Sequence, residues 1–363
     1  MSRKLLTVFV LSFLALSIDV NGQEVDSVKS KKDKKNGIIL LPAIFFSPET
    51  SLGFGAAGMY YFRTNSDSIA KPSNVQGVVI YTLEKQVLIT FPFNLFLKND
   101  QYWANGEWAY YIYPYQYYGT GSDVDLDNFE VYTADFLRME TNLLYKIREN
   151  LYVGPTIFFD HYYKIKLDEN GLLATNQTLG INPQQVFGIG ASFILDKRNN
   201  IFSPSGGYYL EGSILKYEKQ FIGDYGFTDM YIDARKYYSP FDKSEIGFQL
   251  YHQSVLGNAP FYNLALLGGG RQMRGYYEGA YRDHHQTVLQ TEMRHYLFKR
   301  VLVSAFGGVG SISENFGQYE KLLGSYGVGL RYEINSKEKI RIRVDYARGA
   351  NTSGFYININ EAF

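Results

Sequence analysis

Apolar and polar side chains alternate along most of the chain, from residue 37 to residue 363. The segment 326–334 shows the alternation of apolar positions with glycines and charged residues: Tyr326, Val328, Leu330, Tyr332 and Ile334 against Gly327, Gly329, Arg331 and Glu333. Successive side chains of a β-strand point to opposite faces, so this period of two predicts strands with one apolar and one polar face.

The alternation and the turn residues between its segments predict about sixteen strands, an even number, as a closed barrel with both chain ends on one side requires. The expected ranges are 37–46, 51–63, 73–83, 86–97, 101–113, 129–147, 150–165, 184–197, 205–217, 226–238, 242–256, 284–297, 300–311, 321–334, 339–348 and 353–362. A soluble β-sandwich would also alternate, but here the polar positions mix charges and glycines, as a wet lumen permits. We therefore predict an all-β protein, a transmembrane antiparallel β-barrel over residues 37–363.

The first 22 residues have the features of a signal peptide, with Arg3 and Lys4 before an apolar run at 5–18 and a small-residue cleavage site before Gln23. The run is short for a membrane-spanning helix. Residues 23–36 are polar and rich in lysine, and we expect them to form a flexible periplasmic tail. Export combined with a barrel predicts a protein surrounded by lipid in the outer membrane of a Gram-negative bacterium.

Composition removes several function classes. The chain has 36 basic and 36 acidic residues and no cysteine, so neither nucleic-acid binding nor a disulfide framework is expected. No metal site or cofactor is expected either, because the neighbours His284 and His285 would point to opposite faces of a strand. There is no Gly-x-Ser-x-Gly motif, and we interpret histidines at strand ends as interfacial or structural. We therefore predict no catalytic residues and no enzyme.

The longest connection, residues 257–283, contains Gly268-Gly269-Gly270 and then Met273-Arg274-Gly275-Tyr276. A loop of this length without evident secondary structure is often functional. An arginine that points into the lumen needs a carboxylate, and Glu292 and Asp345 on inward strand faces are candidates. We predict that Arg274, Gly275 and Tyr276 hold this loop inside the barrel; the alternative is a disordered surface loop.

Three stretches resemble the BamA/TamA-type outer-membrane assembly superfamily, whose barrel is also called the bacterial surface antigen domain. Residues 273–276 resemble its Val-Arg-Gly-Phe/Tyr motif. A second stretch, with Asp196, Arg198, Pro204 and Gly207, resembles the family's periplasmic turn between the eighth and ninth strands. A third stretch, with Phe306, Gly308 and Gly310, resembles its Phe-x-Asp-x-Gly strand. The resemblance implies an assembly or translocation factor that helps to insert polypeptides.

Two departures from the family pattern qualify this expectation. Members usually carry periplasmic POTRA domains before the barrel, and only residues 23–36 stand in that place here, so we expect a minimal member without them. Gly308 stands where the family has an aspartate, so either Arg274 pairs with another acid, such as Glu292 or Asp345, or the lock is weaker. The expected partners are client outer-membrane polypeptides or periplasmic proteins. The alternatives are a passive pore or structural barrel without insertase activity and, third, a surface hydrolase.

The barrel should close between its first and last strands. Alternation that ends in Phe363 resembles the C-terminal signal by which outer-membrane barrels are assembled; the simpler interpretation is a last strand that ends in phenylalanine. Pro42 in the first strand cannot donate a hydrogen bond and is tolerated mainly at strand edges. We expect a weak seam there, with Leu40 or a neighbour opposite Ile357.

Overall fold

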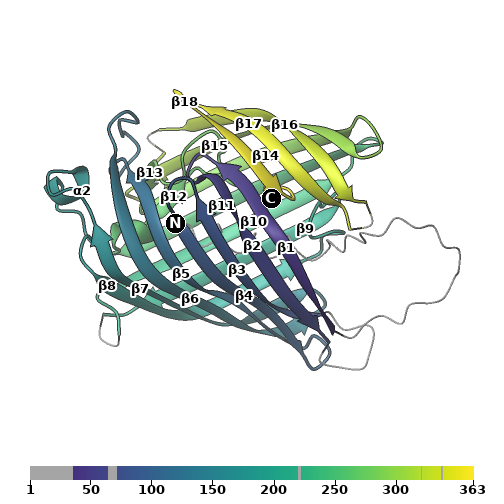
Figure 1. The fold of residues 1–363 in the computed structure, drawn as a ribbon, viewed down its shortest axis with the longest axis horizontal. Helices are drawn as coiled ribbons and strands as arrows, with labels where there is room; N and C mark the ends of the chain where they lie inside the picture. The colour runs from purple at the N-terminus through teal and green to yellow at the C-terminus, as the bar shows by residue number, and fades with distance from the viewer. Residues whose placement is uncertain (1–35, 64–71, 220–221, 320, 337) are drawn as a thin grey trace, which may run out of the picture.

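The computed structural model describes residues 36–63, 72–219, 222–319, 321–336 and 338–363, and sixteen of its strands form one closed barrel (Figure 1). These strands are β1 (Asn36–Ser47), β2 (Ser51–Phe62), β3 (Ser73–Thr82), β4 (Val87–Leu97), β5 (Tyr102–Tyr117), β6 (Glu130–Arg148), β7 (Leu151–Lys166), β8 (Gln184–Asp196), β9 (Gly207–Tyr217), β10 (Phe227–Tyr238), β11 (Ser244–Gly257), β14 (His285–Tyr296), β15 (Val301–Ser313), β16 (Leu323–Asn335), β17 (Ile340–Gly349) and β18 (Thr352–Ile359). The predicted fold class is confirmed.

Each strand pairs antiparallel with the next barrel strand along the chain, and β1 pairs with β18 to close the ring. The barrel begins at Asn36, the last residue assigned above to the periplasmic tail. The predicted signal peptide and the rest of that tail lie outside the described residues. Across the described ranges, no helix is both long and apolar enough to cross a membrane.

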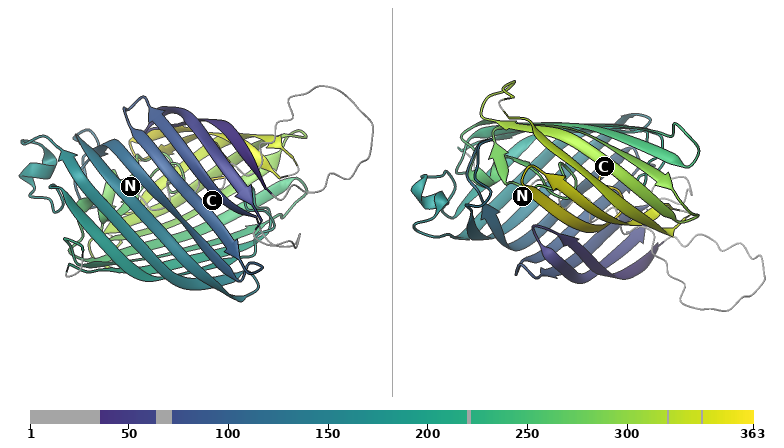
Figure 2. Two further views of the ribbon diagram at one scale, coloured as in Figure 1. Left: turned by 60° about the horizontal axis from the view of Figure 1, so that its bottom comes forward. Right: turned by 90° about the horizontal axis from the view of Figure 1, so that it is seen from above.

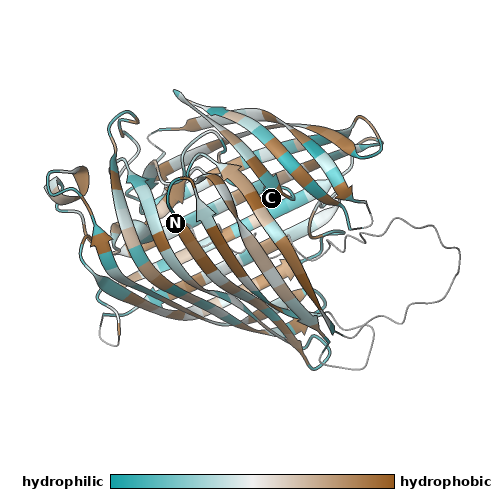
Figure 3. Cartoon of the chain, viewed as in Figure 1, coloured by the Kyte–Doolittle hydropathy of each residue, from teal (hydrophilic) through white to brown (hydrophobic). Residues whose placement is uncertain are grey.

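Hydrophobic and hydrophilic positions alternate along the strands (Figure 3), and the exposed large side chains of the outer face are apolar, as the alternation predicted. On β16, Tyr326, Val328 and Leu330 are 64%, 61% and 49% exposed, whereas the neighbouring Arg331 is fully buried. Because the exposed positions are large and apolar and the buried ones charged, the strand places its apolar side chains outside the barrel and its charges toward the lumen, as expected of a membrane barrel.

The connection between β11 and β14, residues 258–284, is not without structure. We call it the lumen loop. It contains the 3-10 helix η1 (Phe261–Asn263) and the two-stranded sheet β12 (Ala265–Leu267) and β13 (Tyr281–Asp283), which lies within the ring of barrel strands (Figure 1). The prediction of a loop without secondary structure was therefore wrong. A short helix, α2 (Leu172–Thr175), also stands in the connection between β7 and β8.

The core of the protein lies inside the barrel, where the lumen loop packs against opposite walls. Phe261 and Tyr262 of η1 join a cluster of tyrosines on β5 to β7. At the other wall, Leu267, Met273 and Tyr276 pack against Val288 and other residues of β11, β14, β15 and β16. The loop thus fills much of the lumen and is held by apolar contacts on both sides.

Candidate functional site

The tip of the lumen loop, Arg274 to Tyr276, rests on the strands next to the seam. Gly275 has a φ of +106°, and a Cβ at this position would lie 2.7 Å from the Arg348 backbone, so only glycine lets the loop approach β17 this closely. The Gly275 amide donates to the Tyr356 hydroxyl at 2.9 Å. The Tyr276 hydroxyl donates to the Gly324 carbonyl at 2.8 Å. Backbone fit and hydrogen bonds therefore fix the tip against β16, β17 and β18.

Arg274 forms ion pairs with both candidate acids from the sequence analysis, Glu292 and Asp345. Its Nη2 lies 2.5 Å from Glu292 Oε2 and its Nη1 lies 2.5 Å from Asp345 Oδ2. The guanidinium carbon is 3.4 Å from the centre of the Phe306 ring, a cation–π contact. The side chain is 1% exposed. Gly275, Tyr276, Glu292 and Asp345 are thus all in one site with Arg274; that this site acts as a functional lock stays a prediction.

Arg331 on β16 shares both carboxylates with Arg274. Its Nη2 lies 2.8 Å from Glu292 Oε1 and its Nη1 lies 2.5 Å from Asp345 Oδ1. Two buried arginines and two buried acids therefore alternate around a square, in which each charge has at least two partners of opposite sign. Such mutual pairing offsets the cost of taking four charges out of water.

The glycines of the β15 motif make room for the loop. A Cβ at Gly310 would lie 2.8 Å from Leu267 Cδ1 and 3.2 Å from Met273 Cγ, both in the lumen loop. A Cβ at Gly308 would lie 2.8 Å from Gln290 Cβ. This chain therefore has no side chain where the family places an aspartate, and its acids for Arg274 come from β14 and β17 instead.

The second motif forms the turn between β8 and β9, as predicted. Arg198 makes a two-pronged contact with Asp196, with Nε–Oδ1 at 2.9 Å and Nη2–Oδ2 at 2.6 Å. Gly207 has a φ of +95° and approaches the Lys197 carbonyl, where a Cβ would stand at 2.0 Å. The Pro204 carbonyl accepts a hydrogen bond from Arg294 Nη2 at 3.0 Å, which joins the turn to the charges in the lumen.

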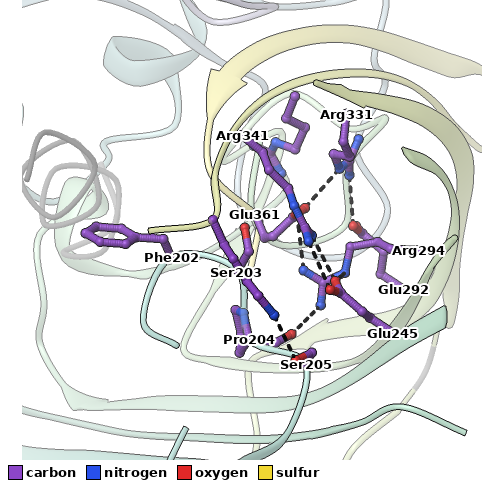
Figure 4. A network of polar contacts seen from close by, with 12 residues as sticks. Phe202, Ser203, Pro204, Ser205, Glu245, Glu292, Arg294, Arg331, Arg341 and Glu361 are labelled. Atoms are coloured by element: carbon purple, nitrogen blue, oxygen red, sulfur yellow. Dashed lines mark hydrogen bonds and ion pairs between the residues drawn. The ribbon is translucent and has the colours of Figure 1, made fainter. Parts of the chain in front are cut away.

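Beyond β18 the chain bends into the lumen, and Figure 4 shows the resulting network. Glu361 Oε2 lies 2.9 Å from Arg331 Nε, while its Oε1 lies 3.0 Å from Arg341 Nη1 and 3.3 Å from Arg294 Nη1. Arg341 in turn holds Glu245 at 2.8 Å. Arg331 contacts both Glu361 and the two acids that bind Arg274, so it links the segment after β18 to the Arg274 site.

This bend corrects the expected strand 353–362. The last strand ends at Ile359, and Phe363 is buried in the lumen against Tyr237. Had the strand continued, Glu361 would share the outer face with Phe355, because both lie at odd positions of the alternation. Bending inward instead gives its carboxylate three arginines. The expected last strand is therefore shorter than predicted, and the role of Phe363 as an assembly signal stays a prediction.

The seam between β1 and β18 is short. The two strands have one registered pair, Phe46 opposite Ile357, whereas all twelve residues of β1 pair with β2. Leu40 is six positions away from this pair, so the expected pairing with Ile357 was wrong. β18 ends at Ile359, two residues beyond this pair, whereas β1 extends ten residues from Phe46 to Asn36. Figure 2 shows the first strands (purple) and the last strands (yellow) on the two sides of the seam. Residues 36–43, including Pro42, therefore form an edge without a registered partner on β18.

Four further residues of this network were not identified from the sequence: Arg331, Glu361, Arg294 and Arg341. The three arginines link Glu361 to Glu292, Asp345 and Glu245. The alternation puts all three arginines on inward strand faces, so a search for inward charges of both signs would have found most of the network. Glu361 could not be found in that way, because its position depends on the bend after Ile359.

A closed barrel with an arginine-bearing loop inside defines a particular class of membrane protein. The Omp85 superfamily domain matches residues 81–363, and the chain belongs to that superfamily. The resemblance drawn from the three motifs is thereby confirmed. Barrels of this superfamily are generally transport or assembly proteins, not enzymes, and are consistent with a bacterial outer membrane.

Solved structures of similar fold agree with this assignment. BamA from Haemophilus ducreyi lacking POTRA domains 1–3 matches with a TM-score of 0.64 and 13% identity, over 91% of this chain and 71% of that chain. CdiB from Acinetobacter baumannii matches with a TM-score of 0.57 and 13% identity, over 90% of this chain and 60% of that chain. CdiB from Escherichia coli matches with a TM-score of 0.57 and 11% identity, over 91% and 64%.

At these identities the similarity is one of fold. The chain spans less than two thirds of either CdiB chain. A comparison with curated proteins gave no match.

Proposed function

We propose that this barrel inserts or translocates polypeptides in the outer membrane of a Gram-negative bacterium, and that the β1–β18 seam is the place where a client pairs. The observation that carries the proposal is the single registered pair across the seam. An unpaired strand edge is a template for β-pairing. Residues 36–43 of β1 offer such an edge without breaking the other strand pairs.

The lumen loop supports this role because it stabilises the wall beside the seam. Arg274 joins β14 to β17, and Gly275 binds Tyr356 of β18. The last strands are therefore tied together from inside by contacts that do not involve β1. If the seam opens, β18 can separate from β1 while the remaining wall keeps its shape. This role needs no catalytic group.

In this proposal the Asn36 end of the barrel faces the periplasm and the lumen loop enters from the cell surface, because short turns are typical of the periplasmic side. Lipids of the outer membrane contact the exposed face of the strands. The clients are outer-membrane polypeptides, delivered by periplasmic partner proteins.

A passive pore or structural barrel remains the second candidate. Beside the charge network lies a cavity with polar and aromatic walls, among them Trp103, Glu107, Tyr231 and Arg235. A wet cavity of this kind would suit a pore if it continued through the barrel.

Reconstitution into liposomes separates the two functions. The purified chain is placed in proteoliposomes, an unfolded eight-stranded barrel polypeptide is added, and client folding is followed by its mobility on unheated gels. We expect client folding about tenfold faster than in empty liposomes, which corresponds to about 1.4 kcal/mol in the barrier. Ion conductance measured on the same vesicles tests the alternative: steady conductance with no gain in client folding would make the pore the better account.

A further inference from the structure

The outer surface carries a band of polar side chains at the loop end of β11, β14 and β15. On the same face, the row just below consists of Leu250, Leu289 and Val309, which are 46%, 52% and 38% exposed and aligned in register. The band itself consists of serine, threonine and histidine residues: His252, Ser254, His285, Thr287, Ser311 and Ser313. It therefore stands directly beyond the exposed apolar row, toward the loop end of the strands. We infer that it lies near the depth where acyl chains meet headgroups.

Three members of this band have the geometry of an activated nucleophile. Ser254 Oγ lies 2.8 Å from His252 Nε2. On the other side of the same ring, His252 Nδ1 lies 2.9 Å from Thr287 Oγ1. A hydroxyl that contacts an imidazole, which is itself oriented by a third group, is the arrangement that activates serine in covalent catalysis.

The sequence places these groups together through two simple relations. His252 and Ser254 are two residues apart on β11, so both side chains leave the same face of the strand. Thr287 lies directly opposite His252 in the β11–β14 register. The arrangement therefore rests on strand geometry and not on a loop conformation.

A fourth group, His285, completes a directed chain of hydrogen bonds. Its Nδ1 lies 2.8 Å from Ser254 Oγ. When His285 donates to Ser254, the Ser254 hydroxyl proton points to His252 Nε2, and the His252 Nδ1 proton points to Thr287. Each imidazole then acts with one donor and one acceptor nitrogen. In this state Nε2 of His252 is free to take the proton of the serine.

Phe316, which follows β15, covers part of the site. Phe316 lies edge-on against the rings of both His252 and His285, with centroid distances of 5.5 Å and 5.8 Å. Ser254 is 4% exposed and His285 is 6% exposed, whereas Phe316 itself is 72% exposed. An apolar cover over a serine–histidine pair at the lipid boundary favours an apolar ligand.

We propose that Ser254 is the nucleophile of a second, lipid-facing site, with His252 as general base and Thr287 as a positioning residue. The substrate class is an acyl ester of a membrane lipid, whose carbonyl would lie level with the polar band while its chain lies over Leu250 and Leu289. This activity goes beyond the proposed insertion function, and β16, β17 and β18 separate the site from the seam.

The reaction is an acyl transfer to water. Ser254 Oγ forms a bond with the ester carbonyl carbon while His252 Nε2 takes its proton. The bond to the alcohol oxygen then breaks, and His252 returns the proton to the departing alcohol. Water, deprotonated by His252, cleaves the acyl–serine ester to release the fatty acid and regenerate the hydroxyl. The products are a lysolipid and a fatty acid, with no oxidant or metal required.

Covalent labelling of the unmodified full chain is the first test, and it needs no variant. The chain in phosphatidylcholine liposomes is treated with a fluorophosphonate that carries an alkyl tail, and the modified peptide is identified by mass spectrometry. We expect modification at Ser254. Absence of any adduct at Ser254, or equal labelling of several surface serines, would overturn the proposal.

Variants then test the roles by release of fatty acid from the same liposomes. Ser254→Ala should abolish release and labelling, and His252→Gln should lower the rate about 100-fold, as loss of a general base does. The control Ser353→Ala alters an exposed serine on the outer face of β18, away from the band, and should leave both unchanged.

Thr287→Val should lower kcat with little change in KM, and Thr287→Ser should restore it, a result that a merely structural role would not give. Gel mobility of unheated samples confirms that each variant is folded. Release that persists in folded Ser254→Ala would overturn the assignment.

Discussion

Phe46 of β1 lies opposite Ile357 of β18, and these two residues form the one registered pair between the first and last strands of the described barrel. Both side chains belong to the outer face, where the Phe46 ring also meets Phe355 edge-on at 5.8 Å. The barrel is therefore closed at one end of the seam by apolar contacts, while residues 36–43 of β1 have no registered partner on β18. The seam is the weakest junction of the ring because it has the fewest ladder positions.

The first prediction concerns the lumen loop. Arg274→Ala should destabilise the barrel by about 3 kcal/mol, the lower end for a broken buried ion pair, because Arg331 still contacts Glu292 and Asp345. The freed loop should be cut by proteinase K added outside liposomes, with cleavage mapped to residues 268–279. Equal cutting of the original chain and the variant would mean that the arginine does not hold the loop.

A second variant tests whether close packing, in addition to the ion pairs of Arg274, holds the lumen loop in place. Gly310→Val keeps Arg274 and its acids but places a side chain where Leu267 and Met273 now lie. We expect it to expose the loop to protease as well. If only the charge variant does so, the glycines of β15 are not needed to seat the loop.

The second prediction concerns pH. Burial alone would raise the pKa of Glu361, but Arg294, Arg331 and Arg341 outweigh it and hold the pKa well below its ordinary value of 4.5. A carboxylate with a lowered pKa stabilises the folded state above pH 4.5, and this contribution is lost as pH falls toward the folded-state pKa.

Unfolding of Glu361→Gln in urea tests this contribution. Near neutral pH the variant should be less stable than the original chain by at least about 1.4 kcal/mol, the value of one pKa unit. The difference should shrink steadily below pH 4.5. A difference that stays constant from pH 7 to pH 3 would show that the carboxylate charge contributes nothing.

Much of the fold followed from the sequence because alternation is a local property. The outer face of β16, which carries Val328, could be assigned from the sequence of that strand alone, without knowing which strands pair with it. In the same way, the inward face of β14 supplied Glu292 as a candidate partner for Arg274. In both cases the structure agrees, since each conclusion needs only the strand period and the sign of a charge.

The remaining features depend on which strands meet and where a strand stops. Glu361 joins the network because the chain turns inward after Ile359, which no periodicity indicates. The offset between Phe46 and Ile357 depends on the closure of the whole ring. Ser254 and His252 share a face by simple alternation, yet Thr287 completes their arrangement only through the register of two strands that are separated by the lumen loop.

The third prediction tests the lipid-facing surface. Val328→Arg, on the exposed face of β16, should cost about 2–4 kcal/mol if the position lies near the bilayer midplane. Gly324→Ser is the control, because it lies on the same face near the strand end and a Cβ there meets no atom within 4 Å. Gly327 is unsuitable, since a Cβ there would stand 2.4 Å from the Phe306 ring and from the Tyr346 carbonyl. Urea midpoints in lipid bilayers should differ clearly between Val328→Arg and the control, and equal midpoints would mean that this face does not contact lipid.

The fourth prediction addresses the seam itself. The chain has no cysteine, so Phe46→Cys combined with Ile357→Cys introduces one defined crosslink across the registered pair. Phe54→Cys with Tyr81→Cys is the matched control, because these two exposed residues lie opposite each other on β2 and β3. Both pairs should allow the barrel to fold.

The most direct test of polypeptide insertion through the seam is the rate of client folding in proteoliposomes that contain the Phe46–Ile357 cysteine pair, measured oxidised and then reduced. Our account predicts that the oxidised form folds clients no faster than empty liposomes, that reduction restores the rate, and that the Phe54–Tyr81 pair is active in both states. Equal client folding by the oxidised and reduced seam variant would contradict it.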